Sequence, residues 1–120
     1  PRDVSAATVT ASALYELSMY DETNRTGYVD RADRILENLT NRYRASVGKD
    51  CGFLLLHSTG SKTHGSEVDV PIVYADYYYL EALLRKAKLE KEQSKVSREL
   101  AATEKIRKKT SEDLLSCKIN

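Results

Sequence analysis

Several residue types that define common protein classes are scarce in this sequence. Its 120 residues include two cysteines, one methionine, one phenylalanine, two prolines and no tryptophan. Cys51 and Cys117 have no metal-binding or redox spacing, and a single pair makes no disulfide framework, so we expect free thiols. No apolar run approaches the length of a membrane span. A disulfide-stapled domain and a membrane-spanning chain are therefore excluded as interpretations.

Positively and negatively charged side chains are also nearly equal in number. Nineteen Lys and Arg residues face 18 Asp and Glu residues, which leaves a net charge of +1. This near-neutrality argues against nucleic-acid binding by the chain as a whole. The start at Pro1 lacks the charged and apolar regions of a signal peptide, and we expect a processed product or an excerpt of a longer protein.

Apolar residues at helical spacing predict three main helices, near residues 4–19, 27–45 and 73–90 or beyond. The first is apolar nearly all round, which is typical of a helix inside a larger assembly, and Asp3 is placed to cap it. The second is amphipathic. The apolar positions of the third are Val73, Tyr74, Tyr77, Leu80, Leu84 and Ala87.

Beyond Glu81 the sequence becomes densely charged. Glycine and proline are absent there, so we expect the helix to continue to about Leu115. Its apolar residues do not keep a clean heptad, which makes the coiled-coil pattern weak. The basic residues are compatible with a nucleic-acid or acidic-membrane partner, but without interleaved aromatics or a known module we predict neither. A solvated helix is the simpler interpretation.

A polar loop from His57 to Asp69 is predicted between two apolar elements. It follows a short buried extended segment near residues 53–57 and precedes Pro71. Ligand-contacting loops are commonly built in this way. The loop contains the residues His57, Ser58, Ser61, Lys62, His64, Glu67 and Asp69.

No catalytic or metal-binding constellation can be assembled from these residues. Ser58 follows His57 directly, yet nothing specifies an orienting acid or an oxyanion hole. His57 and His64 lack the tight spacing of a helical metal site, and loop histidines are common without metal. We therefore predict no catalytic residue, no metal and no cofactor within this chain.

Two blocks of sequence resemble a known enzyme family. HSTGSK, followed by EVDVPIVYADYYYLEALLR, resembles the C-terminal end of bacterial unsaturated glucuronyl hydrolases, and PRDVSAATVTASALYELS resembles a segment slightly upstream. The resemblance covers residues 1–89 and leaves 90–120 outside as a charged helical tail. It implies an all-α fold: the last helices of an (α/α)6 barrel with a short extended segment, plus a charged C-terminal helix.

The resemblance also implies a reaction. These glycoside hydrolases remove 4,5-unsaturated uronic acid from the oligosaccharides that polysaccharide lyases produce, including glycosaminoglycan-type products. An aspartic acid is thought to hydrate the double bond as general acid/base. The two key aspartates lie upstream of the matched part, so Asp3, Asp69 and Asp76 are not assigned their role. The isolated chain is expected to be inactive, and the resemblance suggests the bacterial cytoplasm or periplasm.

Within the resemblance, the HSTGSK loop lies at the barrel mouth. Some members hold a sulfate or other substituent on the sugar with serines and a lysine there. The implied substrate-binding residues, with an unsaturated uronyl oligosaccharide as partner, are His57, Ser58, Ser61 and Lys62, and the last two fit best because a hydroxyl and an ammonium donate to anions. Equally, the loop could merely close the last helical pair. Glu67 and Asp69 would repel an acidic sugar, so bracing suits them better.

Two other classes of function stay open. The charged tail could make the chain a helical protein-interaction module, or a basic nucleic-acid or membrane binder. Only residues 90–120 favour either, whereas the two matched blocks favour the hydrolase.

The first helix generates a prediction about the isolated chain. Two partner helices cannot cover a helix that is apolar on so many sides, so a large apolar patch stays exposed. We expect self-association, a swapped oligomer or a molten state. Sedimentation that found a compact monomer, with sharp cooperative unfolding, would contradict this expectation.

Overall fold

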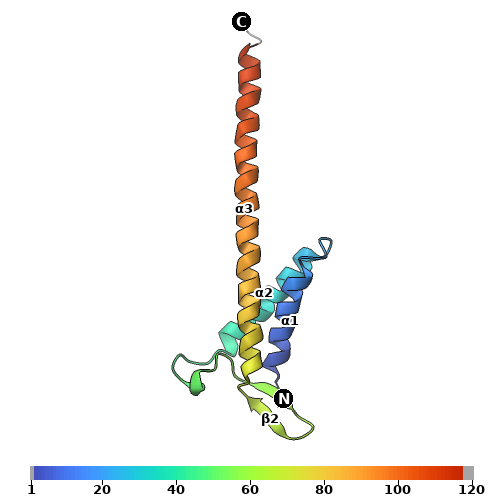
Figure 1. Cartoon of the computed structure of the whole chain (residues 1–120), viewed down its shortest axis with the longest axis vertical. Helices are drawn as coiled ribbons and strands as arrows, with labels where there is room; N and C mark the ends of the chain where they lie inside the picture. The colour runs from blue at the N-terminus through green and yellow to red at the C-terminus, as the bar shows by residue number, and fades with distance from the viewer. Residues whose placement is uncertain (1, 118–120) are drawn as a thin grey trace. The chain divides into compact units, whose positions relative to one another are not determined.

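The computed structural model describes residues 2–117 and is mostly helical (Figure 1). Its elements are α1 (Val4–Leu17), α2 (Arg25–Arg42), the 3-10 turn η1 (Asp50–Gly52), β1 (Ser58–Ser61), β2 (Ser66–Val70) and α3 (Val73–Cys117). The chain divides into two compact units, Pro1–Lys86 and Ala87–Asn120. The first unit contains every element up to the beginning of α3, and the described part of the second is helical throughout.

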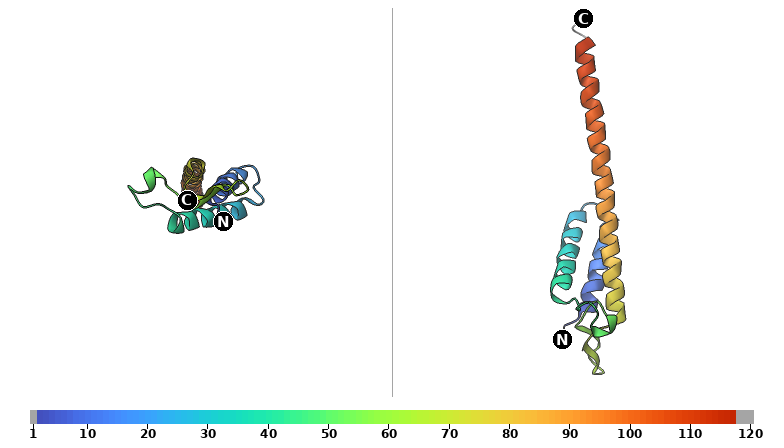
Figure 2. Two further views of the ribbon diagram at one scale, coloured as in Figure 1. Left: turned by 90° about the horizontal axis from the view of Figure 1, so that it is seen from below. Right: turned by 90° about the vertical axis from the view of Figure 1, so that its left-hand side faces the viewer.

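The three predicted helices are confirmed, with small differences at their ends. Asp3 caps α1 as predicted, because its carboxylate Oδ1 accepts a hydrogen bond from the Ser5 backbone N–H at 3.1 Å. The amphipathic face of α2 is buried at Ala32, Leu36 and Leu39. In the first unit, α1, α2 and the first turns of α3 lie side by side (Figure 2).

The buried face of α1 is more polar than a core helix normally is. Ser5, Thr8 and Ser12 are buried together with Val4, Ala11 and Tyr15. The Thr8 hydroxyl donates to the Ser5 carbonyl at 2.8 Å, and the Ser12 hydroxyl donates to Glu81 of α3. Buried hydroxyls need such partners to avoid a desolvation cost. Small hydroxyl residues also let the neighbouring helices approach closely.

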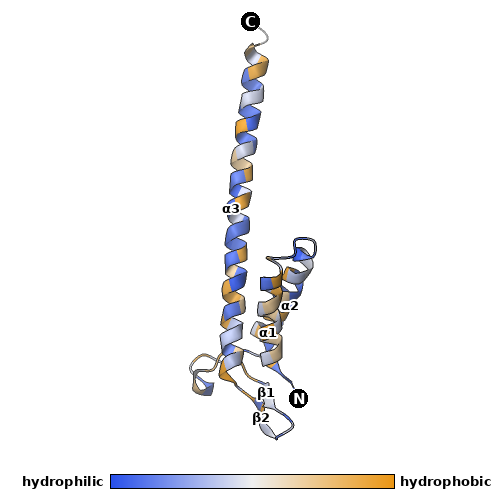
Figure 3. Ribbon diagram, turned by 45° about the vertical axis from the view of Figure 1, so that its right-hand side comes forward, coloured by the Kyte–Doolittle hydropathy of each residue, from blue (hydrophilic) through white to orange (hydrophobic). Residues whose placement is uncertain are grey.

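The apolar positions that predicted α3 are not its buried face. All six are exposed, with Val73 at 71% and Leu84 at 71%. The buried residues of α3 are instead Ala75, Tyr79, Ala82 and Leu89. The Tyr79 hydroxyl lies 2.7 Å from Thr40 Oγ1 of α2. Figure 3 shows hydrophobic residues interleaved with hydrophilic ones along α3, so periodicity alone did not identify the side that packs.

The extended segment and the loop after it differ from the prediction in detail. Leu55 is fully buried and forms an isolated bridge with Arg44, and only this position counts as strand-like between residues 53 and 57. The predicted loop is a hairpin, because β1 and β2 pair antiparallel with Ser61 opposite Ser66. Residues 67–70 alternate polar and apolar side chains, but Ser58–Ser61 does not, so only one of the two strands carried a strand pattern. The pairing is irregular between Ser58 and Thr59.

Asp76, in the first turn of α3, braces the extended segment. One carboxylate oxygen accepts from the Leu54 N–H at 2.9 Å and the other from the Leu55 N–H at 3.0 Å. Two backbone donors that enter the core are therefore satisfied by one side chain. This bidentate arrangement holds the start of α3 against the chain just before the hairpin.

Replacing Asp76 tests that brace. Asp76→Asn keeps the side-chain volume but places an amide donor against a backbone donor, so we expect a loss of about 1–3 kcal/mol in the free energy of unfolding. Urea unfolding measures it. The matched control is Asp30→Asn at an exposed position of α2, which should cost under about 0.5 kcal/mol. Equal losses in both variants would refute the bracing role.

Candidate functional site

The hairpin is attached to the start of α1 by three hydrogen bonds. The Val4 N–H donates to the His57 carbonyl at 3.2 Å, and the Thr59 N–H donates to Asp3 Oδ1 at 3.3 Å. The Thr59 hydroxyl donates to the Arg2 carbonyl at 2.8 Å. Asp3 therefore serves both as helix cap and as anchor for β1.

The electrostatics of Asp3 follow from these contacts. Burial alone would raise the pKa of the Asp3 carboxyl, but hydrogen bonds from Ser5, Thr59 and Ala6 outweigh it and lower the pKa below its ordinary value. Donors to the ionised form favour that form. The anchor is consequently an anion at neutral pH.

His57 lies at the base of the hairpin in the left-handed backbone region, with φ 67°. Its Nδ1 lies 2.7 Å from Asp69 Oδ1 on the other side of the hairpin. Its ring makes an edge-to-face contact with Tyr43 at 6.1 Å between centroids. The His57 side chain is 38% exposed and that of Asp69 is 56% exposed. The contact agrees with a bracing role for Asp69 and leaves part of the imidazole accessible.

The other three predicted contact residues differ in accessibility. Lys62 is exposed and Ser61 is half-buried, with the Ser61 hydroxyl 2.9 Å from His64 Nδ1. Ser58 is fully buried, and its hydroxyl has no hydrogen-bond partner within residues 2–117. The hairpin thus presents His57, Ser61 and Lys62 to solvent and turns Ser58 inward. Whether any of the four binds a substrate stays a prediction.

The side chain of Glu67, on the opposite strand, lies against Gly60. A Cβ atom built on Gly60 would lie 3.1 Å from Glu67 Cβ and closer still to the Glu67 carboxylate. The missing side chain of Gly60 therefore makes room for Glu67. Glu67 itself is exposed and has φ 52°.

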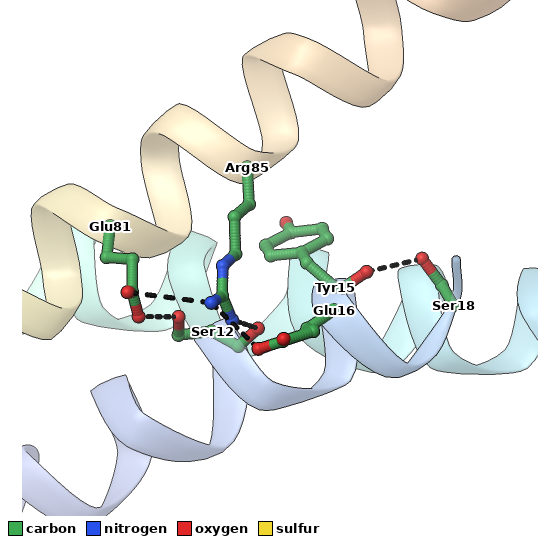
Figure 4. Close-up of polar contacts among 6 residues, drawn as sticks. All are labelled: Ser12, Tyr15, Glu16, Ser18, Glu81 and Arg85. Atoms are coloured by element: carbon green, nitrogen blue, oxygen red, sulfur yellow. Dashed lines mark hydrogen bonds and ion pairs between the residues drawn. The ribbon is translucent and has the colours of Figure 1, made fainter. Parts of the chain in front are cut away.

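A polar cluster between α1 and α3 escaped the sequence analysis (Figure 4). Arg85 donates from Nη1 to the Ser12 carbonyl at 2.7 Å, and its Nη2 lies 2.8 Å from Glu16 and 3.5 Å from Glu81. Ser12 donates its hydroxyl to the same Glu81. The four-residue spacing of Glu81 and Arg85 was a usable pattern, but nothing in the sequence linked either residue to α1.

A second polar cluster joins all three helices of the first unit. Lys86 Nζ and the Tyr15 hydroxyl each lie 2.5 Å from Asp33 Oδ1. Burial alone would raise the pKa of Asp33, but the hydrogen bonds from Lys86 and Tyr15 and the charge of Lys86 lower it below its ordinary value. The cluster borders a shallow cleft of about 420 Å³ between α2 and α3, which Leu36 and Leu83 also line.

The described residues contain no group of three or more His, Cys, Asp or Glu side chains arranged to hold a metal ion. Both cysteines are exposed free thiols, as predicted. Across residues 2–117, no helix has the length and apolar content needed to cross a membrane. The hairpin carries several hydroxyl groups, one ammonium at Lys62 and two carboxylates at Glu67 and Asp69.

Comparison with known proteins finds relatives of one kind. The chain is 47% identical over 90 residues to an unsaturated glucuronyl hydrolase of Formosa agariphila, across 74% of this chain and 22% of that protein. It is 32% identical over 88 residues to an unsaturated chondroitin disaccharide hydrolase of Streptococcus agalactiae, across 71% and 22%. No family model matches the chain.

Solved structures agree. An unsaturated glucuronyl hydrolase specific for heparin aligns with a TM-score of 0.73 and 47% identity, over 76% of this chain and 24% of that one. A hydrolase described with dGlcA-Glc-Rha-Glc aligns at 0.66 and 31% identity, over 70% and 23%. The chain spans about a quarter of these relatives. The matched fold is part of an α/α barrel, which confirms the predicted fold class.

The lowered pKa values of Asp3 and Asp33 predict acid sensitivity. A carboxyl whose folded pKa lies below its unfolded value stabilises the fold fully above about pH 4, and this contribution is lost as pH falls through the folded pKa. The free energy of unfolding should therefore decline below about pH 4. In Asp33→Asn the decline should be shallower, because one titrating group is gone.

The control for this prediction is Asp30→Asn, which changes an exposed aspartate on the same helix. It should keep the wild-type pH dependence. Urea unfolding at pH values from about 2.5 to 7 measures all three proteins. If the free energy of unfolding of Asp33→Asn fell with decreasing pH as steeply as that of the wild type, the cluster would not stabilise the fold in the way proposed.

Proposed function

Because the matched three quarters of this chain belong to the unsaturated glucuronyl hydrolase family, we propose that the chain supplies part of such an enzyme. The reaction is removal of 4,5-unsaturated uronic acid from oligosaccharides made by polysaccharide lyases, including glycosaminoglycan-type products. The observation that carries the proposal is 47% identity over 90 residues together with a TM-score of 0.73. The sequence comparison and the structural comparison both find unsaturated glucuronyl hydrolases as relatives.

Within this proposal, residues 1–89 form the hydrolase part and residues 90–120 a helical tail. The hydrolase part contributes substrate contacts at the barrel mouth, and the general acid/base comes from outside it. The charged sugar meets the exposed side of the hairpin, where the Lys62 ammonium and the Ser61 hydroxyl donate charge-assisted hydrogen bonds to a sulfate or carboxylate.

The other residues of the hairpin take supporting roles. His57 is partly exposed and held by Asp69, so it can add a third donor when protonated. Ser58 is buried, which favours a packing role over direct contact. Glu67 and Asp69 are anions on the same hairpin and restrict where a negatively charged sugar can bind. In this proposal, their negative charges favour a position of the anionic substituent near Lys62.

A second candidate function has one observation in its favour. Every side chain from 90 to 117 is exposed on a continuous helix. Such a helix can act as an interaction module independently of the hydrolase part.

The test is a chimera. Residues 1–89 replace the matching segment of the Formosa agariphila relative, and turnover is followed by loss of the ultraviolet absorbance of the conjugated double bond. The double variant Ser61→Ala/Lys62→Ala should lower kcat/KM on a sulfated disaccharide by about tenfold or more, since a charge-assisted contact is worth about 1.5–3 kcal/mol. An unsubstituted disaccharide should lose much less.

Two controls define the outcome. Lys49→Ala changes an exposed lysine outside the hairpin and should leave kcat/KM for both substrates unchanged. The chain alone should show no turnover. Equal losses on the two substrates would leave the hairpin a structural lid, and turnover by the isolated chain would refute the division of roles.

A further inference from the structure

Two helices of the first unit carry an apolar face that no described residue covers. We call these surfaces the α1 face and the α3 face. All eight of their residues are exposed, with Leu84 at 71% and Tyr77 at 60%. The α1 face consists of Ala6, Val9, Ala13 and Leu17, and the α3 face consists of Val73, Tyr77, Leu80 and Leu84.

Each face lies opposite the side through which its helix packs. On α1, Ala13 stands two positions from the buried Ala11, and on α3, Leu84 stands two positions from the buried Ala82. Every other member of the two faces is likewise two positions from a buried residue. Two positions correspond to about 200° of rotation around an α-helix. Both helices therefore have one packed side and a second, apolar side turned away from it.

The second helix of the unit shows what a solvent-facing side looks like in this chain. The outward side of α2 is charged, with Asp30, Arg31, Arg34 and Glu37 all exposed. A helix at the surface of a protein normally carries such residues outward. The α1 face and the α3 face have no charged member. They are therefore built to be covered, whereas α2 is built to meet water.

The polar groups nearest the two faces are compatible with burial. Thr10 lies beside the α1 face, and its hydroxyl donates to the Ala6 carbonyl at 2.7 Å. Covering this hydroxyl would leave no unpaired donor. On the α3 face, the Tyr77 ring lies edge-to-face against Tyr78, with 5.1 Å between centroids. This contact holds the largest side chain of the face in place before any partner arrives.

We propose that the α1 face and the α3 face are the two surfaces on which the remaining helices of the hydrolase barrel pack. The chain spans about a quarter of its relatives, whose fold is an α/α barrel. A segment of a closed ring of helices needs a neighbour at each of its two edges, and two apolar edges are observed. The identity of the partner rests on the proposed function.

A second copy of the chain is a less suitable occupant. Stable interfaces between separate proteins bury about 800 Å² on each partner, and even an aromatic side chain supplies only about 150–250 Å². Half of the α1 face is alanine, and the side chains of the α3 face are each partly covered already. Either face is large enough for one neighbouring helix within a barrel, where several such contacts act together.

The experiment compares thiol labelling in the full 120-residue chain with labelling in the chimera that carries residues 1–89. Native cysteines are replaced by serine in both proteins, including Cys51 and Cys117 of this chain. Leu17→Cys reports on the α1 face and Leu84→Cys on the α3 face. We expect each thiol to react at least tenfold more slowly in the chimera than in the chain, because a neighbouring helix covers it.

Val47→Cys is the matched control, because Val47 is 91% exposed and lies outside both faces. Its labelling rate should agree within twofold between the chain and the chimera. Equal rates for the face thiols in the two proteins would overturn the proposal, and so would a chimera in which all three thiols react rapidly. Slow labelling in the isolated chain that accelerates on dilution would assign the faces to a second copy and overturn the assigned partner.

A stability measurement makes the test independent of cysteine chemistry. Leu80→Glu places a charge on the α3 face, at a position that is 48% exposed in this chain. It should lower the Tm of the chain by under about 2 °C and that of the chimera by about 5 °C or more, because only the chimera buries the charge. Equal shifts would contradict the proposal. Neither measurement uses turnover, so an inactive chimera with protected thiols would refute the proposed hydrolase role alone.

Discussion

The packing of α1 against α3 depends on one side chain, Arg85, and on the acceptors around it. Its guanidinium reaches the Ser12 carbonyl, Glu16 and Glu81, while Ser12 donates to Glu81. Because three of the six buried residues of α1 are Ser or Thr, the helix buries polar groups as well as apolar ones, and directional contacts help to select the register. Asp33, with Lys86 and Tyr15, does the same between the three helices.

The hairpin depends on that packing because two helix starts hold it. Asp3 at the start of α1 accepts from Thr59, and Asp76 in the first turn of α3 accepts from Leu54 and Leu55. Carboxylates are favoured at helix N-termini, so each anchor stabilises its own helix as well. If α1 moved relative to α3, the two anchors would separate and the hairpin would lose its position. The polar cluster therefore determines where the candidate contacts lie.

Much of this could be predicted from the sequence, and the limits have physical causes. Local patterns identified the three helices and the Asp3 cap, since these depend on neighbours in sequence. The hairpin was missed because Ser58 to Ser61 carries no strand pattern and its pairing depends on partners several residues away. The packed face of α3 was misjudged because Ala75 and Ala82 have smaller apolar side chains than Tyr77 or Leu84, yet the alanines permit closer approach and are the residues that pack. The burial of Ser58 was not predicted, because polarity alone cannot indicate burial, and its role as a ligand contact stays a prediction.

The same limits apply to the polar clusters. Ser12 and Glu81 are 69 residues apart, and neither residue type predicts a buried partner. The measurement that tests the account most directly is the coupling between them, from a double-mutant cycle with Ser12→Ala and Glu81→Met followed by urea unfolding. The account predicts a coupling free energy of about 1 kcal/mol or more. A coupling indistinguishable from zero would contradict it, because α1 and α3 would then be held by something other than this cluster.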